Sequence, residues 1–297
     1  MTRQLMTEQN LSLTQASQAV GLAKSTWYYK PRPRPPRPLN AVLVATIDAL
    51  WSKTRGVYGY RKIHALLRAQ GLIVNHKAVL RHLRRLDRLQ PRKTKGVRWT
   101  RPKVVHPTSS NTYWEMDLTY VWCGSGFGYL FAVLDAYDRG VPGARFGDRC
   151  RAVEAVQALE EAVAARFGGC VPDEHTLTLR VDRGSQFIAH RFQEAAKTLN
   201  VLLEYAGIQC PNDKPYIESF FGHYKTEEVY RSTYTTLAEA QVGWSLYRIW
   251  HETERVHESL QYQTPQRVVT QSAHPCATAA AGPGPGRTCV PDRSEQP

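Results

Sequence analysis

Three acidic residues from separate parts of the chain have the types and settings that metal-assisted chemistry on phosphate esters requires. Asp117 lies in the middle of "TYWEMDLTYVW", an alternating segment that is typical of a β-strand. Asp182 ends the predicted strand "TLTLRVD", and Glu218 lies in the predicted helix "KPYIESFFGHYKTEEV". A carboxylate inside an apolar strand is costly unless it is paired or binds a cation. These three acids are therefore candidate catalytic residues and metal ligands.

Three carboxylates from three separate elements can converge to hold two divalent ions. Mg²⁺ suits such a site because it takes hard oxygen ligands and leaves positions for water and phosphate oxygens. Two ions roughly 4 Å apart can activate a nucleophile and stabilise the leaving oxygen of an in-line phosphoryl displacement. The acids therefore favour a metal-dependent reaction at phosphodiesters.

Lys225 follows Glu218 by seven residues, which is close to two helical turns. The two side chains then share one helix face, about 10 Å apart along the axis. In the functional interpretation, Glu218 binds metal and Lys225 holds a DNA phosphate; in the alternative, both are scattered charges of a solvated amphipathic helix. Gln186, just after Asp182, is a candidate DNA contact, and a turn-stabilising role is an equal alternative.

The elements that must position these residues are predicted to form one α/β domain. After residue 110, three predicted strands are followed by a helix at 151–169, a strand ending at Asp182, a helix, a strand at 201–207 and the Glu218 helix. This order predicts a five-stranded sheet with mixed pairing and flanking helices. Strand ends in α/β sheets are where sites gather, which suits Asp182.

The first 110 residues differ sharply in charge from the rest of the 297-residue chain. They hold 22 Lys and Arg residues and only three Asp and Glu residues. The rest of the chain holds 17 Lys and Arg residues and 23 Asp and Glu residues. The net charge of +13 therefore combines a strongly basic part with a mildly acidic part. Such asymmetry favours a DNA-binding arm, although a merely basic, soluble protein is the alternative.

Helical patterns in the basic half predict small DNA-binding segments. Residues 11–30 read as a helix-turn-helix, and "PRPRPPRP" at 31–38 predicts a stiff, extended linker. A second helical hairpin ends in the cationic segment "HKAVLRHLRRLDRL", which fits a recognition helix. The candidate DNA-binding residues are Arg61, Lys62, Lys77, Arg81, Arg84 and Arg85.

Several other classes of protein receive no support. The six cysteines form no C-x-x-C pair, and neither a G-x-S-x-G elbow nor a phosphate-binding G-x-x-x-x-G-K-[ST] loop occurs. No apolar run is long enough to span a membrane, and the start of the chain has no secretory signal. We therefore expect a protein without a membrane partner.

The segments "WEMDLTY", "VDRGSQF" and "KPYIESFFGHYK" together resemble the catalytic core of the DDE transposases and retroviral integrases. Thirty-five residues separate Asp182 from Glu218, as in that family. "RGVYGYRKIHALLRAQGLIVNHKAVLRHLRR" and "ERVHESLQYQTPQRV" resemble segments before and after the core of OrfB-type transposases of bacterial insertion sequences. The likeness covers roughly residues 11–270.

The resemblance implies a ribonuclease-H-like core that uses Mg²⁺ or Mn²⁺ for DNA strand cleavage and strand transfer. Asp117, Asp182 and Glu218 match the metal-binding triad, and Lys225 matches the DNA-contacting cation. The implied partners are double-stranded DNA of element ends and target, further copies of this chain, and an upstream helix-turn-helix product. The implied location is the bacterial cytoplasm, at the nucleoid.

Two residues depart from the family pattern, which has a small polar residue in place of Val181 and asparagine in place of Lys214. DNA binding could survive in a chain with these two departures while catalysis weakens. The alternative function is therefore a catalytically silent DNA-binding regulator or decayed transposase, and a plain nuclease is a third reading.

The predicted domains follow these patterns. In chain order they are a helix-turn-helix (1–30), a Pro/Arg linker (31–39), a helical DNA-binding domain (40–90), a basic linker (91–110), an integrase-like core with its C-terminal helix (111–271) and a disordered tail (272–297).

Overall fold

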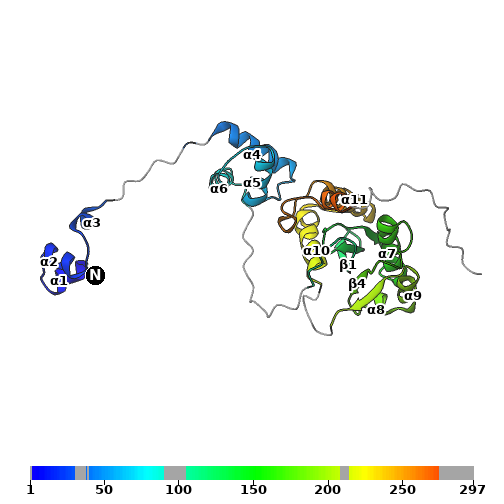
Figure 1. Ribbon diagram of the computed structural model, residues 1–297. Helices are drawn as coiled ribbons and strands as arrows, with labels where there is room; N and C mark the ends of the chain where they lie inside the picture. The colour runs from blue at the N-terminus through cyan, green and yellow to red at the C-terminus, as the bar shows by residue number, and fades with distance from the viewer. Residues whose placement is uncertain (1, 31–37, 39, 90–104, 208–213, 274–297) are drawn as a thin grey trace, which may run out of the picture. The chain divides into compact units, whose positions relative to one another are not determined.

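A computed structural model describes residues 2–30, 38, 40–89, 105–207 and 214–273 (Figure 1). The chain divides into two compact units, Met1–Val44 and Ala45–Pro297. The predicted linkers at 31–39 and 91–110 and the predicted tail at 272–297 lie largely outside the described residues. Among the helices that the structure describes, none combines the length and apolar character that crossing a bilayer requires.

Three short helices lie within the first unit. They are α1 (Thr2–Glu8), α2 (Leu13–Ala19) and α3 (Lys24–Tyr28). Ser12 caps α2 in a reciprocal capping box with Gln15, which satisfies two backbone donors at the helix start. The pair α2 and α3 gives the helix–turn–helix arrangement predicted for residues 11–30.

Three more helices make up the basic helical segment of the chain. They are α4 (Ala41–Lys53), α5 (Tyr60–Ala69) and α6 (His76–Arg85). The apolar residues spaced along them are buried against one another, with Ile47, Ile63 and Leu83 fully enclosed. The Asn75 side chain caps α6 by accepting a hydrogen bond from the Lys77 amide at 2.8 Å.

The large domain is built on a mixed five-stranded sheet, as predicted. Its strands are β1 (Tyr113–Trp122), β2 (Phe127–Asp135), β3 (Gly143–Gly147), β4 (Thr178–Val181) and β5 (Leu202–Tyr205). Their order is β3-β2-β1-β4-β5; β1 runs antiparallel to β2 and parallel to β4. This strand order places β1 at the centre of the sheet.

Helices cover both faces of the sheet. Figure 1 shows α7 (Ala152–Phe167) and α9 (His190–Thr198) on one side of β1 and α10 (Pro215–Glu227) on the other. The remaining helical elements are α8 (Ser185–Ile188), η1 (Val229–Arg231), α11 (Leu237–Thr253), η2 (Glu258–Leu260) and α12 (Pro265–Ala273). Gly143 allows α7 to approach β3, because a Cβ there would lie 2.2 Å from the carbonyl oxygen of Ala158.

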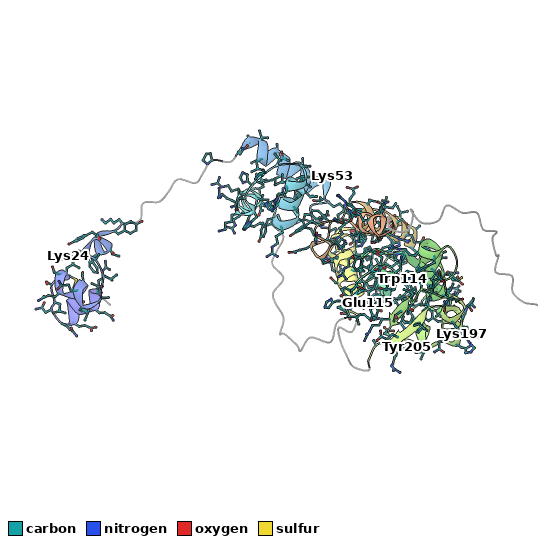
Figure 2. The ribbon with its side chains drawn as sticks, viewed as in Figure 1. Lys24, Lys53, Trp114, Glu115, Lys197 and Tyr205 are labelled. Atoms are coloured by element: carbon teal, nitrogen blue, oxygen red, sulfur yellow. The ribbon has the colours of Figure 1, made fainter. Side chains whose placement is uncertain are left out.

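Strand β1 serves a different purpose on each face, because successive side chains point to opposite sides. Trp114 and Met116 are fully buried in the apolar core shared with α7. Glu115, the residue between them, is buried on the side of α10, and Figure 2 marks it beside Trp114. Asp117 follows on the same side as Glu115. The strand therefore joins the apolar core to the candidate site.

Candidate active site

Asp117 and Asp182 lie side by side at the centre of the sheet. The parallel strands β1 and β4 pair Glu115 with Arg180, and each carboxylate comes two residues later on its strand. Asp117 is in β1, while Asp182 follows the last residue of β4. Two neighbouring parallel strands thus bring two predicted ligands to the same place, with Asp182 at a strand end and Asp117 in mid-strand.

Lys214 joins these two carboxylates. Its Nζ lies 2.9 Å from Asp117 Oδ1 and 3.5 Å from Asp182 Oδ2. The same nitrogen lies 3.4 Å from the carbonyl oxygen of Met116. The lysine side chain is only 7% exposed, against 20% for Asp117 and 44% for Asp182. A cation is therefore held between the two aspartates inside the domain.

This arrangement fits a divalent ion in its donor chemistry. Two carboxylate oxygens from separate strands converge on one positive charge, and carboxylate oxygens are the protein ligands that Mg²⁺ prefers. The ammonium of Lys214 stands where such an ion would meet both aspartates. The Asp117 and Asp182 side chains would hold it.

Glu218 lies one helical turn beyond Lys214 in α10, with its amide donating to the Lys214 carbonyl oxygen at 3.1 Å. Its side chain is exposed. Across the described ranges, no three His, Cys, Asp or Glu side chains form a metal-holding group. The structure thus brings two of the three predicted ligands together, with the third at the start of the adjoining helix.

Glu115 attaches this helix to the sheet, a role that the sequence analysis missed. Its Oε2 accepts hydrogen bonds from the amides of Tyr216 at 2.9 Å and Ile217 at 2.8 Å. These amides belong to the first turn of α10, where backbone donors have no partner within the helix. Burial raises the pKa of Glu115 to about 7, although the two amides and the charges of Lys214 and Arg139 oppose that rise.

Replacing Glu115 with alanine is expected to lower the free energy of unfolding by about 1–3 kcal/mol, because one buried and one partly buried amide lose their acceptor. Glu115→Gln keeps a carbonyl acceptor and should lose less. Urea denaturation of both variants measures the difference. Equal stability of the wild-type protein and Glu115→Ala would show that the cap does not hold α10.

Lys225 lies near an exposed group of aromatic side chains. Its Nζ is 5.1 Å from the centroid of the Tyr120 ring. Tyr120 and Trp122 contact Phe127 edge to face, and all three rings are about half exposed. Lys225 is partly buried, two turns after Glu218 on α10. Its contact with DNA remains a prediction.

The other predicted DNA-binding residues occupy several settings. Lys77, Arg84 and Arg85 are exposed on α6, and Arg81 is partly buried there. Arg61 pairs with Glu258 at 3.4 Å, both side chains being exposed. Gln186 is partly buried, in α8.

Lys62 differs from these residues because its ammonium lies 4.6 Å from the centroid of the Tyr58 ring. Burial, together with the nearby charge of Arg255, lowers its pKa to about 7. This predicted DNA-binding residue is therefore partly enclosed, and burial weakens its tendency to carry a charge near neutral pH.

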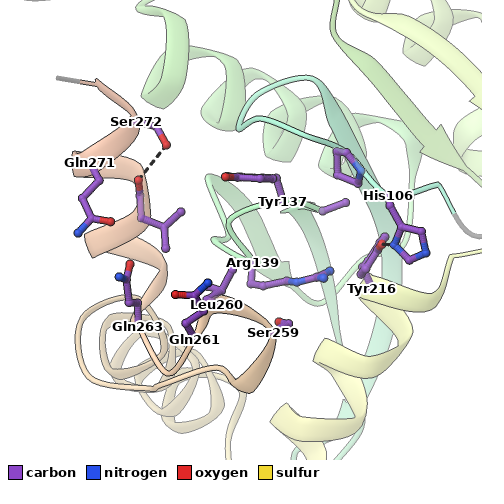
Figure 3. Close-up of a pocket in the computed structure, with 13 residues that line it drawn as sticks. His106, Tyr137, Arg139, Tyr216, Ser259, Leu260, Gln261, Gln263, Gln271 and Ser272 are labelled. Atoms are coloured by element: carbon purple, nitrogen blue, oxygen red, sulfur yellow. Dashed lines mark hydrogen bonds between the residues drawn. The ribbon is translucent and has the colours of Figure 1, made fainter. Parts of the chain in front are cut away.

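A cavity of about 470 Å³ lies next to the start of α10 (Figure 3). Arg139 and Tyr216 line it, together with His106 and residues of α12 such as Gln271. The Arg139 guanidinium lies 3.9 Å from the centroid of the Tyr216 ring. Asp117, Asp182 and Glu218 do not line this cavity, so it is separate from the carboxylate pair.

Family comparisons match most of the described chain. A model described as an integrase core domain matches residues 107–210, and a second of the same description matches 200–265. A model described as an HTH-like domain matches residues 38–95. The core matches therefore contain Asp117, Asp182 and Glu218.

Several curated relatives come from bacterial insertion elements. An uncharacterized 31.7 kDa protein of insertion element IS407 from Burkholderia multivorans is 28% identical over 86% of this chain and 90% of its own length. A putative transposase of IS986/IS6110 from Mycobacterium tuberculosis is 29% identical over 69% and 79%. The putative transposase InsK of IS150 from Escherichia coli is 25% identical over 89% and 95%.

Two of the solved structures that match this chain are viral. The simian T-cell lymphotropic virus intasome in complex with a PP2A regulatory subunit matches with a TM-score of 0.49 and 17% identity, over 84% of this chain and 80% of that chain. The HTLV-2 integrase catalytic core in complex with magnesium matches with a TM-score of 0.43 and 14% identity, over 54% and 97%.

Proposed function

Because this chain belongs to the integrase-core family of insertion-sequence transposases, we propose that it cleaves DNA strands and transfers them to a target in a reaction that depends on divalent metal ions. The metal-dependent chemistry is supported by one observation: Asp117 and Asp182 converge on one buried positive charge. A site that holds an ammonium between two carboxylates also has the charge and the donors for Mg²⁺ or Mn²⁺.

In this proposal Asp117, Asp182 and Glu218 hold two ions. When bound, these ions supply activation of the attacking oxygen and stabilisation of the leaving oxygen. Asp117 on β1 and Asp182 just after β4 would hold these ions against the phosphodiester, and Glu115 anchors the helix that carries Glu218. The attacking oxygen comes from water in cleavage and from a DNA 3′-hydroxyl in transfer, so no protein side chain acts as nucleophile.

The remaining charges bind the substrate. Lys225 and Gln186 contact the DNA backbone near the carboxylates, while the cationic face of α6 binds duplex DNA away from them. The partners are therefore double-stranded element ends and target DNA, in the cytoplasm of a bacterium, at its nucleoid. Two DNA ends must be held together, which favours a homo-oligomer on DNA, with an upstream helix-turn-helix product as a further partner.

The test is an assay of the purified full chain on candidate element ends with a labelled target duplex, with and without Mg²⁺. We expect cleaved ends and joined products only with the metal. Cleavage without joining would support a plain nuclease instead. Binding without either product would support a catalytically silent DNA-binding protein and overturn the proposal.

Neutralising Arg81, Arg84 and Arg85 together by alanine should weaken DNA binding and flatten its salt dependence. Each lost phosphate contact lowers the slope of log K against log salt by about 0.9, so the slope should fall by roughly 2–3. Fluorescence anisotropy across a salt series measures it. Arg191→Ala, an exposed arginine on α9, is the matched control. An unchanged slope in the triple variant would exclude α6 from the phosphate contacts.

A further inference from the structure

Lys214 is the buried cation of the candidate site, and its setting combines three features. Its ammonium contacts both Asp117 and Asp182, and it lies near the carbonyl oxygen of Met116. Its side chain is 7% exposed. Its main chain caps α10, the helix that carries Glu218. A long cationic side chain is ordinarily found at the surface, where its charge is hydrated.

We propose that Lys214 is a built-in counter-cation of the Asp117–Asp182 pair, and that a divalent ion must displace its ammonium in order to bind both carboxylates. This inference rests on the proposed function, because it concerns the same metal site. It adds a residue that governs when the site can take metal.

The charges explain why a counter-cation is needed. Two carboxylates that both approach one nitrogen within 3.5 Å lie close to each other, and like charges at such range repel strongly in a partly buried site. Lys214 removes most of that repulsion in the metal-free protein. A divalent ion cannot share the same position with an ammonium, because two cations would then repel in turn.

The backbone explains how the ammonium can leave. Pro215 occupies the first turn of α10, and the Lys214 carbonyl oxygen accepts the Glu218 amide. Both features hold the Lys214 main chain in place as the start of the helix. Displacement therefore needs rotation of the lysine side chain alone, while Glu218 keeps its position at the helix start.

A permanent structural ion pair is the competing explanation. In that case Lys214 would stay between the aspartates in the working protein, and its removal would lower stability without improving metal binding. The two explanations make opposite predictions for metal affinity in a variant that lacks the charge.

The test measures Mn²⁺ binding to the full chain by electron paramagnetic resonance, without DNA. Lys214→Met, which keeps the length of the apolar stem, should bind Mn²⁺ about 10- to 100-fold more tightly than the wild-type protein, because no ammonium has to be displaced. Lys214→Arg, which keeps the charge, should bind weakly, as the wild type does. Lys197→Met, on the exposed face of α9, should leave the affinity unchanged.

Thermal unfolding gives a second readout that does not depend on activity. In EDTA, Lys214→Met should melt below the wild-type protein, because the carboxylates face each other without a counter-charge. Mg²⁺ should raise its Tm by more than it raises the wild-type Tm, since tighter binding stabilises the folded state more. Equal increases would overturn the proposal. Because each protein is compared with itself, a general loss of stability in the variant does not hide this result.

The outcomes separate the two proposals. Equal Mn²⁺ affinities of wild type and Lys214→Met, with binding abolished by Asp117→Asn, would overturn the role of Lys214 while leaving the metal site intact. Mn²⁺ binding that Asp117→Asn does not affect would overturn the metal site itself, and the inference with it. Tighter binding in Lys214→Met that Asp117→Asn removes would support both.

Discussion

Replacing Asp117 with asparagine is expected to lower Mg²⁺-dependent DNA cleavage by about a thousandfold or more while leaving DNA binding nearly unchanged. A bound divalent ion contributes several kcal/mol of transition-state stabilisation, and each 1.36 kcal/mol corresponds to about tenfold in rate. Asparagine keeps the shape of the side chain but removes the charge that attracts the ion.

The fold should tolerate this change, because the Lys214 ammonium keeps Asp182 as its charged partner. Asp117 Oδ1 accepts a hydrogen bond from the Leu118 amide at 2.8 Å, and the asparagine oxygen can accept the same bond. Binding should persist because the cationic residues of α6 lie outside the carboxylate pair. Single-turnover cleavage of an end-labelled duplex and anisotropy on the same duplex measure the two effects. Asp148→Asn, an exposed acid, is the matched control.

Cleavage by Asp117→Asn at the wild-type rate would exclude Asp117 as a ligand. A parallel loss of cleavage and DNA binding would mean that the substitution disturbs either the fold or the DNA-binding surface. Circular dichroism then distinguishes a folding defect from a binding defect. Only a selective loss of cleavage agrees with the proposed role.

Replacing Arg255 with methionine is expected to lower the free energy of unfolding by about 3–5 kcal/mol, because it leaves a buried carboxylate without its partner. The Arg255 guanidinium binds Glu227 through two hydrogen bonds of 2.8 Å each, and its side chain is 2% exposed. Tyr247 donates a third bond to Glu227 at 3.0 Å. Burial raises the pKa of Glu227, but the hydrogen bonds and charge of Arg255 outweigh it and lower that pKa overall.

A double variant tests whether the loss comes from the unpaired charge. Glu227→Leu combined with Arg255→Met should recover much of the stability, because no buried carboxylate then remains. Urea denaturation curves of the wild type, both single variants and the double variant give the coupling free energy. Additive losses in the double variant would contradict a buried pair and indicate independent packing effects.

Much of the fold could be predicted from local patterns. Alternation around Asp117, the apolar run at 128–137 and the double glycine after α7 predict elements that the structure contains. Such patterns succeed because the period of apolar residues reflects which side of an element is buried. Placing Asp117 within β1 and Asp182 at the end of β4 also needs only local information together with strand order.

The partners of the site residues could not be predicted in the same way. Lys214 differs from the asparagine of the family pattern, but nothing local indicates that its ammonium reaches Asp117. Glu115 carried a usable signal, because it is a second acid within an apolar strand, and the argument applied to Asp117 holds equally for it. Glu227 and Arg255 lie 28 residues apart, and only the packing of α10 against the segment after α11 brings them together.

Glu115 and Asp117 stand two positions apart on one side of a central strand, so the anchor of α10 and the first carboxylate depend on the same pairing register. Inserting or deleting one codon between Tyr113 and Glu115 would turn both side chains into the apolar layer. The turn around Gly124, beyond the far end of that strand, carries no such constraint on either acid. In-frame insertions and deletions of one residue that abolish activity should therefore cluster in a few codons of β1. Mutational scanning for loss of transposition should find this cluster.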